Sequence, residues 1–178
     1  SLRIGCILML ICGLVAGVVA LVNEITYDTI EANLAAERKA AIIDIFGSET
    51  LAYEAVENCP DTVVAVYRVT DGGTALGYCV NLNSGGFGGD INMMVGVGED
   101  GTIVGVTIVS LSETAGLGSR VNDAAYLAQY IGKGGSLVFK TDIDGITGAT
   151  ISSKAVLSGV NMAMAALETM GLAGGVSK

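Results

Sequence analysis

The segment from Asp144 to Ser152 combines residue types that could hold a phosphate group. Gly148 and Ala149 have no side chain or a very small one, so a bulky anion could approach the backbone closely. Thr150 adds a hydroxyl directly before a helical pattern that begins at Ile151. Unpaired N–H groups and the helix dipole favour a phosphate at such a position. Thr and Ser are also preferred helix caps, so these residues alone leave a simple N-cap turn as the alternative.

Two Gly-rich stretches earlier in the chain offer backbone that a flat ring could approach. Residues 83–90 place the aromatic Phe87 among glycines, and residues 112–119 contain Glu113 and Thr114. Neither stretch has the glycine pattern of a nucleotide-binding loop. Plain hairpin loops are the alternative interpretation of both stretches.

The composition restricts the possible functions. The chain of 178 residues contains 26 Gly, 1 Pro and no His. The lack of His excludes a Ser-His-Asp hydrolase and a His-bound zinc site. A net charge of -9 argues against a nucleic-acid partner, because contacts to phosphates need Lys and Arg. We therefore expect proteins, lipid or a small cofactor as partners.

Residues 1–22 have the composition of a single transmembrane helix. Residues 4–22 carry no charge and would extend roughly 28 Å at about 1.5 Å per residue, close to the thickness of a bilayer's hydrocarbon core. Arg3 precedes this run and Glu24 follows it. The positive-inside rule therefore places the N-terminus in the cytoplasm and the rest of the chain on the outer face of the cell membrane. A cleaved secretory signal peptide is the alternative.

The rest of the chain divides into a helical connector, residues 23–47, and one α+β domain, residues 48–178. Its β-branched and alternating runs predict strands over residues 62–70, 75–82, 91–97, 102–109 and 137–140. The helical patterns cover residues 123–130 and 151–170. The second of these helices should bury an apolar stripe of Val156, Val160, Met164 and Leu167. Short Gly-containing turns at residues 71–73 and 99–101 predict a mainly antiparallel sheet packed with helices.

These elements, taken in order, resemble the FMN-binding domain shared by the G subunit of the Rnf complex and the C subunit of the sodium-pumping NADH:quinone oxidoreductase. That family shows a membrane helix, a Gly-aromatic-Gly-Gly loop, a loop similar to E-T-P-G-L-G, and D-x-x-[ST]-G-A-T before the last helix. The corresponding residues are 86–89, 113–118 and 144–150. Ala115 stands where the family usually has Pro, and Leu111 where many members have His. The resemblance covers nearly the whole chain.

The resemblance implies that Thr150 carries flavin mononucleotide (FMN) through a phosphoester bond. A separate flavin transferase, which uses FAD and magnesium, makes this bond in the family. Thr147 is the competing acceptor, and Asp144 is either a recognition residue for the transferase or a turn residue. The other residues expected to contact the cofactor are Phe87, Gly88, Glu113, Thr114, Gly116, Leu117, Gly118, Gly148 and Ala149.

The resemblance further implies a membrane-anchored electron-relay subunit, itself non-catalytic, of an ion-translocating ferredoxin:NAD oxidoreductase (Rnf) complex. Its partners would be the other membrane subunits of that complex. The compact length favours the Rnf protein over its quinone-linked relative, which is one alternative. A membrane-anchored structural or adhesion domain without flavin and an outer-surface flavin reductase are the others. The coupling ion, sodium or proton, stays open.

The four cysteines form two pairs along the chain. Cys6 and Cys12 lie in the apolar run, and Cys59 and Cys79 lie in the domain. None has the spacing of a metal site. Cys79 falls in a predicted strand, where it is most simply a small buried apolar residue. An outer location would nevertheless permit a disulfide between Cys59 and Cys79.

Overall fold

The long first helix, α1 (Leu2–Phe46), contains a stretch of membrane-spanning length. The computed structural model describes the backbone of residues 2–172 and the side chains of residues 3–23 and 33–172, and it divides into two units, 1–39 and 40–178. In the first unit, the 21 residues Arg3–Asn23 have a mean hydropathy of 2.8, and none of this stretch is buried. A helix of this length rises about 32 Å, which is enough to cross a bilayer's hydrocarbon core. The side chain of Glu24, used to predict the orientation, lies outside the described residues.

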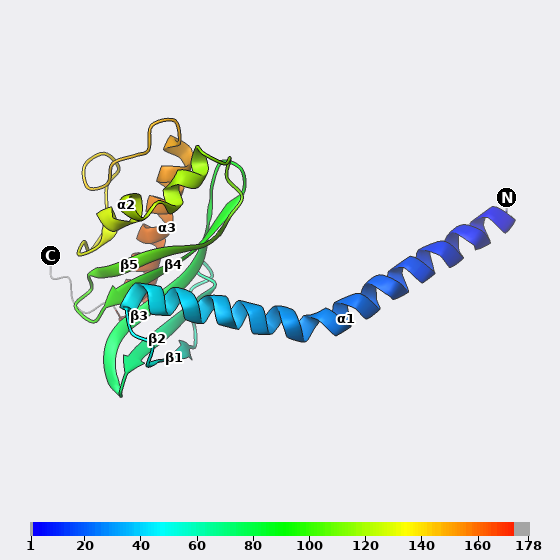
Figure 1. Ribbon diagram of the computed structural model, residues 1–178, viewed down its shortest axis with the longest axis horizontal. Helices are drawn as coiled ribbons and strands as arrows, with labels where there is room; N and C mark the ends of the chain where they lie inside the picture. The colour runs from blue at the N-terminus through cyan, green and yellow to red at the C-terminus, as the bar shows by residue number, and fades with distance from the viewer. Residues whose placement is uncertain (1, 173–178) are drawn as a thin grey trace. The chain divides into compact units, whose positions relative to one another are not determined.

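The second unit is built on a five-stranded antiparallel sheet in which each strand pairs with the next in sequence (Figure 1). The strands are β1 (Leu51–Val56), β2 (Ala65–Asp71), β3 (Thr74–Gly85), β4 (Asp90–Gly98) and β5 (Ile103–Leu111). Gly72 and Gly73 close the turn between β2 and β3 with φ angles of 56° and 89°, which glycine adopts without strain. The last four strands confirm the predicted antiparallel sheet.

Alternate residues of the sheet face two separate hydrophobic clusters. Met93 and Val95 in β4 contact the cluster beneath the long helix α3 (Thr150–Thr169), whereas Met94 between them belongs to the cluster on the other face. A Cβ on Gly159 would lie 2.7 Å from the Met93 sulfur, so α3 approaches the sheet closely at this glycine. The predicted stripe is buried at all four of its positions, Val156, Val160, Met164 and Leu167.

The last turns of α1 cover the opposite face of the sheet. Ile42 and Ile45 are buried there with Met94. A Cβ on Gly96 of β4 would collide with Ile45 Cγ2, so the helix packs this closely only because the strand lacks a side chain at that point. The compact second unit begins at Ala40 and so includes these turns of α1.

Gly47 caps the C-terminal end of α1. It has a φ angle of 72°, and its N–H donates to the Ile43 carbonyl at 2.7 Å. A glycine in the left-handed region is the common C-terminal cap of a helix.

Two segments differ from the predicted elements. The edge strand β1 is absent from the prediction because the run is short and only Leu51, Tyr53 and Val56 are partly buried, which is not a regular alternation. The strand predicted over residues 137–140 is wrong, since Lys140 takes a φ angle of 64° and the Asp142 carboxylate accepts the Val138 N–H at 2.7 Å. These two features turn the chain. An isolated bridge between Phe139 and Ile143 is the only β-pairing of the described segment 137–140.

The helix predicted over residues 123–130 consists of two short pieces. They are α2 (Ala124–Leu127) and the 3-10 helix η2 (Ala128–Tyr130), and a further 3-10 helix, η1 (Gly118–Asn122), precedes them. These short helices fill the chain between β5 and the long irregular segment, residues 131–149, that leads to α3.

Cys59 and Cys79 do not form the disulfide that an outer location would permit. Both thiols are free. Cys79 belongs to the cluster on the face covered by α1, whereas Cys59 packs against the cluster on the α3 face. Burial raises the pKa of the Cys79 thiol to about 12, so this residue stays neutral and behaves as a small apolar side chain.

Candidate functional site

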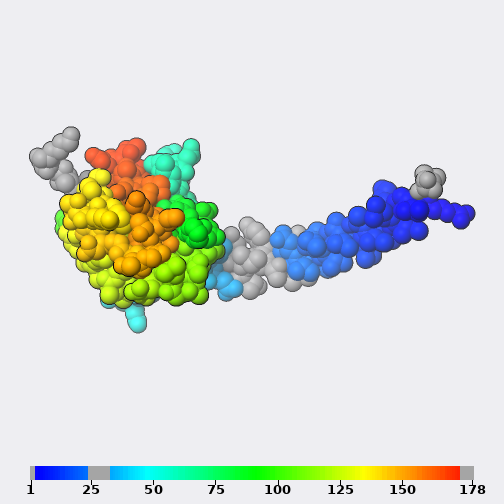
Figure 2. All heavy atoms as spheres, turned by 90° about the horizontal axis from the view of Figure 1, so that it is seen from above, coloured from blue at the N-terminus to red at the C-terminus, as the bar shows by residue number. Residues whose placement is uncertain are grey.

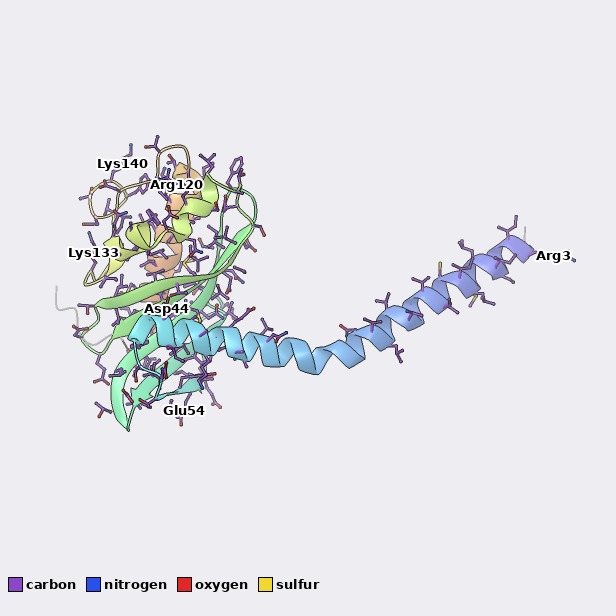
Figure 3. The ribbon with its side chains drawn as sticks, in the orientation of Figure 1. Arg3, Asp44, Glu54, Arg120, Lys133 and Lys140 are labelled. Atoms are coloured by element: carbon purple, nitrogen blue, oxygen red, sulfur yellow. The ribbon has the colours of Figure 1, made fainter. Side chains whose placement is uncertain are left out.

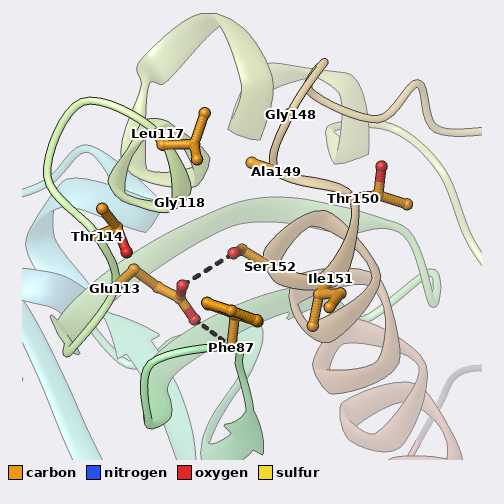
Figure 4. A pocket seen from close by; sticks show the side chains of 10 residues that line it. All are labelled: Phe87, Glu113, Thr114, Leu117, Gly118, Gly148, Ala149, Thr150, Ile151 and Ser152. Carbon is orange, nitrogen blue, oxygen red and sulfur yellow. Dashed lines mark hydrogen bonds between the residues drawn. The ribbon is translucent and has the colours of Figure 1, made fainter.

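Three segments that are far apart in the sequence form the wall of one pocket (Figure 4). They are the loop between β3 and β4, the loop between β5 and η1, and the start of α3. Figure 2 shows parts of these segments as green, yellow-green and orange areas on one face of the domain. The pocket has a volume of about 330 Å³, within the usual size of a small-molecule site. Its lining residues are Phe87, Glu113, Thr114, Leu117, Gly118, Gly148, Ala149, Thr150, Ile151 and Ser152.

Thr150 is the first residue of α3, and its side chain is exposed at the pocket. The N-cap position belongs to Ala149, and no side chain forms a cap hydrogen bond there. The alternative that Thr150 serves as a helix cap is therefore wrong. The N–H groups of Thr150, Ile151 and Ser152 have no acceptor within the described part of the chain. A free hydroxyl thus stands beside unpaired donors and the positive end of a 20-residue helix, which together favour an anion.

The backbone before Thr150 is held in place by glycine geometry and by a buried serine. Gly148 has a φ angle of 84°, and a Cβ there would lie 2.9 Å from Leu117 Cδ1. The Ser153 hydroxyl donates to the Ala149 carbonyl at 2.9 Å and accepts the Ile146 N–H at 3.0 Å. The chain on both sides of Gly148 is therefore fixed to the first turn of α3.

Two buried tyrosines support this turn from the interior. The Tyr126 hydroxyl donates to the Ser153 carbonyl at 3.0 Å and lies 3.1 Å from the Tyr130 hydroxyl. Burial raises the pKa of both phenols, so both stay neutral and Tyr126 keeps its proton for the bond to Ser153.

Glu113 connects the three segments of the pocket. Its Oε1 accepts the Phe87 N–H at 2.6 Å and the Gly88 N–H at 3.4 Å, and its Oε2 accepts the Ser152 hydroxyl at 2.9 Å. Gly118 is buried beside this carboxylate, and a Cβ there would lie 2.5 Å from Oε2. The carboxylate thus occupies space that is free only because the neighbouring residue is a glycine.

Large apolar side chains are exposed around the pocket. The exposed fractions are 70% for Phe87, 53% for Ile151 and 44% for Leu117. Apolar side chains that remain exposed together often mark a binding surface, because a ligand can cover them. A flat aromatic ring is a ligand that fits such a surface.

Some predicted site residues lie outside the pocket lining. Asp144 and Thr147 line a separate hollow with Arg120 and Gln129, where the Gln129 side chain accepts the Asp144 N–H at 2.8 Å. Gly88 donates its N–H to Glu113 Oε1 at 3.4 Å, and a Cβ there would collide with the Ser112 carbonyl oxygen. Gly116, with a φ angle of 76°, forms the turn of its loop, and its N–H donates to the Ser119 hydroxyl.

Ile151 and Ser152 line the pocket, although neither is among the residues predicted from the sequence. Ser152 is only 2% exposed and Ser153 is fully buried. A signal for Ser152 exists, because it stands four residues before Val156 and extends the buried stripe of α3 by one turn. A serine at such a position is otherwise indistinguishable from a solvent-exposed one.

The domain has an uneven distribution of charge. Figure 3 shows Arg120, Lys133 and Lys140 around the η1–α3 region, whereas Glu54 lies on the edge strand β1. Residues 112–154, which include two of the pocket segments, contain four Lys or Arg and four Asp or Glu. This part of the domain is therefore formally neutral in a chain with a net charge of -9.

The pocket segments coincide with the part of the chain that matches a known domain. A family model for an FMN-binding domain matches residues 86–165, and a model for the RnfG N-terminal region matches residues 1–45. The G subunit of the Na(+)-translocating ferredoxin:NAD(+) oxidoreductase complex of Acetobacterium woodii is 33% identical, over 91% of this chain and 89% of that protein. The G subunit of the proton-translocating complex of Clostridium ljungdahlii is 36% identical, over 58% of this chain and 60% of that protein.

Solved structures share the fold. NqrC of Shewanella oneidensis superposes with a TM-score of 0.52 at 23% identity, and the match covers 65% of this chain and 66% of that chain. The C subunit of the Na(+)-translocating NADH-quinone reductase of Parabacteroides distasonis gives a TM-score of 0.51 at 23% identity, with 64% of each chain covered.

Proposed function

Since the chain belongs to the RnfG family of ion-translocating ferredoxin:NAD(+) oxidoreductase complexes, we propose that it is a membrane-anchored electron-relay subunit with FMN bound covalently to Thr150. The observation that carries the attachment site is the free hydroxyl of Thr150 at the uncapped start of α3. It stands on the wall of a pocket whose segments fall within the matched FMN-binding domain.

The residues of the pocket fit two parts of FMN, the flat ring and the phosphate. Phe87, Leu117 and Ile151 supply exposed apolar surface for a flat ring. The free N–H groups of the first turn of α3 suit a phosphate. Gly148 keeps the backbone near Thr150 open, since a side chain there would meet Leu117. When bound, FMN supplies the redox chemistry, and the protein contributes its position and electrostatic surroundings.

The bond proposed at Thr150 is a phosphoester made by a flavin transferase with FAD as the donor. Thr150 Oγ1 forms a bond to the phosphorus of the FMN half, the pyrophosphate P–O bond breaks, AMP leaves, and the hydroxyl proton is lost. The exposure of Thr150 supports this assignment, because a separate enzyme must reach the hydroxyl. Thr147 is also exposed, but it lies in the neighbouring hollow rather than on the pocket wall.

The membrane-length part of α1 anchors the chain, and we infer that the FMN domain lies on the outer face of the membrane. Arg3 before the apolar stretch and the acidic residues after it support this orientation through the positive-inside rule. The other membrane subunits of the complex are then its partners, and the flavin transferase is its partner during maturation. In this assembly the chain passes electrons and has no catalytic centre of its own.

The specific alternative is NqrC, the corresponding protein of the NADH:quinone oxidoreductase, which shares the fold. The RnfG relatives cover both the anchor and the domain of this chain, whereas the likeness to NqrC concerns the fold alone. The assignment to the ferredoxin-linked complex is therefore better supported.

Intact-mass measurement of the full chain made together with its flavin transferase tests the attachment site. The wild-type mass should increase by one FMN less one water. Thr150→Val removes the attacking hydroxyl and should abolish the increase, while Thr147→Val, the matched control, should keep it. An unmodified wild-type chain, or loss of the increase only in Thr147→Val, would contradict the proposal.

A further inference from the structure

The hydrogen bonds around Glu113 assign it a role beyond that of one lining residue among ten. We propose that Glu113 is the positioning residue of the pocket, whose carboxylate holds the loop 86–89, its own loop and the first turn of α3 together as one preformed wall. This role rests on the proposed function, because the wall determines how firmly an attached flavin is held.

The carboxylate joins three segments that are far apart in the sequence. They meet at one end of the sheet, where Ile91 of β4 pairs with Leu111 of β5 and the Ser84 hydroxyl donates to the Ala155 carbonyl of α3. Phe87 is 26 residues before Glu113, and Ser152 is 39 residues after it. The two oxygens of Glu113 divide these partners, since Oε1 accepts from the Phe87 backbone at 2.6 Å and Oε2 accepts from the Ser152 hydroxyl at 2.9 Å. Hydrogen bonds to an ionised acceptor are stronger than neutral ones, so this connection is suited to fixing geometry.

The space around the carboxylate admits little rearrangement. Ser152 is 2% exposed, so water cannot easily replace Glu113 as its partner. A Cβ on Gly86 or on Gly118 would collide with a carboxylate oxygen. Gly86 and Gly118, on different segments, thus leave room for the Glu113 carboxylate. If the Glu113 side chain moved away, a gap would remain between the three segments.

The wall matters because Thr150 alone restrains a ligand weakly. Thr150 is exposed, and a flavin attached only through its phosphate could rotate about several single bonds. The Glu113 bonds fix the backbone of Phe87, whose exposed ring forms the rim, relative to Ser152, two residues beyond the anchor. Loss of Glu113 should therefore release the ring from the wall while the phosphoester bond persists.

The flavin arm of the experiment uses the full chain in detergent with FMN attached. Visible circular dichroism and fluorescence anisotropy report whether the ring is held in an asymmetric, rigid site. Glu113→Ala should retain the FMN mass but lose most of the visible dichroism and lower the anisotropy. Ser152→Ala, which removes only the α3 partner, should give an intermediate loss. Ser158→Ala is the matched control, because Ser158 is an exposed serine of the same helix, and it should leave both signals unchanged.

Rescue by a conservative variant separates positioning from general destabilisation. Glu113→Gln keeps an oxygen that can accept the Phe87 N–H and an amide that can donate to Ser152 Oγ. It should recover most of the dichroism lost in Glu113→Ala. If Glu113→Ala disrupts the fold, seen in far-ultraviolet dichroism, Ser152→Ala and Glu113→Gln decide the question. Wild-type signals in Glu113→Ala or in Ser152→Ala would overturn the role of Glu113.

A second arm does not depend on the flavin. Hydrogen exchange, followed by mass spectrometry on peptides that cover residues 83–91, should be at least tenfold faster in Glu113→Ala than in the wild type, because Phe87 loses its acceptor. Unchanged exchange would overturn the positioning role even if FMN is attached. Faster exchange in a chain that carries no FMN would instead contradict the proposed function and leave the connection itself supported.

Discussion

At the residue scale, the strongest feature is the contrast between two threonines of one short segment. Thr150 starts α3 on the pocket wall, whereas Thr147 lies in a hollow beside Arg120 and Asp144. The two hydroxyls are equally plausible acceptors by residue type. The turn at Gly148, with a φ angle of 84°, stands between them, and only Thr150 lines the pocket.

Gly148 should therefore matter for attachment of FMN and not only for stability. Gly148→Ala forces a side chain into a positive φ angle, at a cost of about 1–2 kcal/mol, and also brings it to 2.9 Å from Leu117. We expect a fall of a few degrees in Tm and a clear loss of flavin attachment, measured by intact mass.

Gly135→Ala is the control for Gly148→Ala. Gly135 has a φ angle of 71°, but a Cβ there meets nothing within 4 Å. It should lower the Tm by a similar amount and leave attachment unchanged. Equal attachment in both variants would contradict the role assigned to the Gly148 turn.

The sequence predicts Thr150 as the attachment point because its neighbours form a recognisable motif, and this stays a prediction. The connection between Glu113 and Ser152 could not be predicted from the sequence. Glu113 and Ser152 are 39 residues apart, and nothing local to either indicates that a hydroxyl of one helix will reach a carboxylate of a distant loop. Such pairs arise from the packing of α3 on the sheet. They can be identified only in the folded structure, where the segments are close together.

At the element scale, the end of α1 packs against the sheet of the domain. Ile42 and Ile45 are buried against the sheet face opposite α3, over Gly96 in β4 and its partner Gly105 in β5. A pair of glycines on neighbouring strands gives the helix a flat surface. The helical period of residues 23–46 predicts a helix but not where it docks, because both glycines lie far away in the sequence.

A double-mutant cycle tests this docking. Gly96→Ala should destabilise the domain by about 1–3 kcal/mol, since its Cβ collides with Ile45. Ile45→Ala should cost about 2–5 kcal/mol through lost burial. The double variant should be less destabilised than the sum by roughly 1 kcal/mol, because the smaller side chain makes room for the new methyl group.

Thermal unfolding of the four chains measures this coupling. Gly85→Ala is the control, since a Cβ at Gly85 meets nothing within 4 Å, and it should change the Tm little. Strictly additive effects of Gly96→Ala and Ile45→Ala would contradict the close packing of α1 on β4.

The elements differ in how far the sequence predicts them. The central strands and α3 bury long regular apolar patterns, and these are confirmed. The edge strand β1 buries too few residues to give a pattern, and the run Leu137–Lys140 looks extended although the positive φ angle of Lys140 and the bond from Val138 to Asp142 turn it. A local hydrogen bond of this kind can override the β-propensity of a segment. The amino-acid composition of the segment gives no sign of it.

At the scale of the whole molecule, the chain combines a helix of membrane-spanning length with an acidic domain, and its predicted orientation rests on few charges. A Cys introduced at Thr74, beside the exposed β2–β3 turn, tests the orientation in a Cys59→Ser background. An impermeant thiol reagent should label it on intact cells. Labelling only after the membrane has been permeabilised would place the domain in the cytoplasm.

The most direct test of the central assignment is fragment mass spectrometry on the chain purified from native membranes. Trypsin should release residues 141–154, which contain both Thr147 and Thr150 between cleavage sites at Lys140 and Lys154. We predict that every C-terminal fragment that includes Thr150 but not Thr147 carries FMN less one water. FMN on fragments that require Thr147, or a peptide without any flavin, would contradict the assignment.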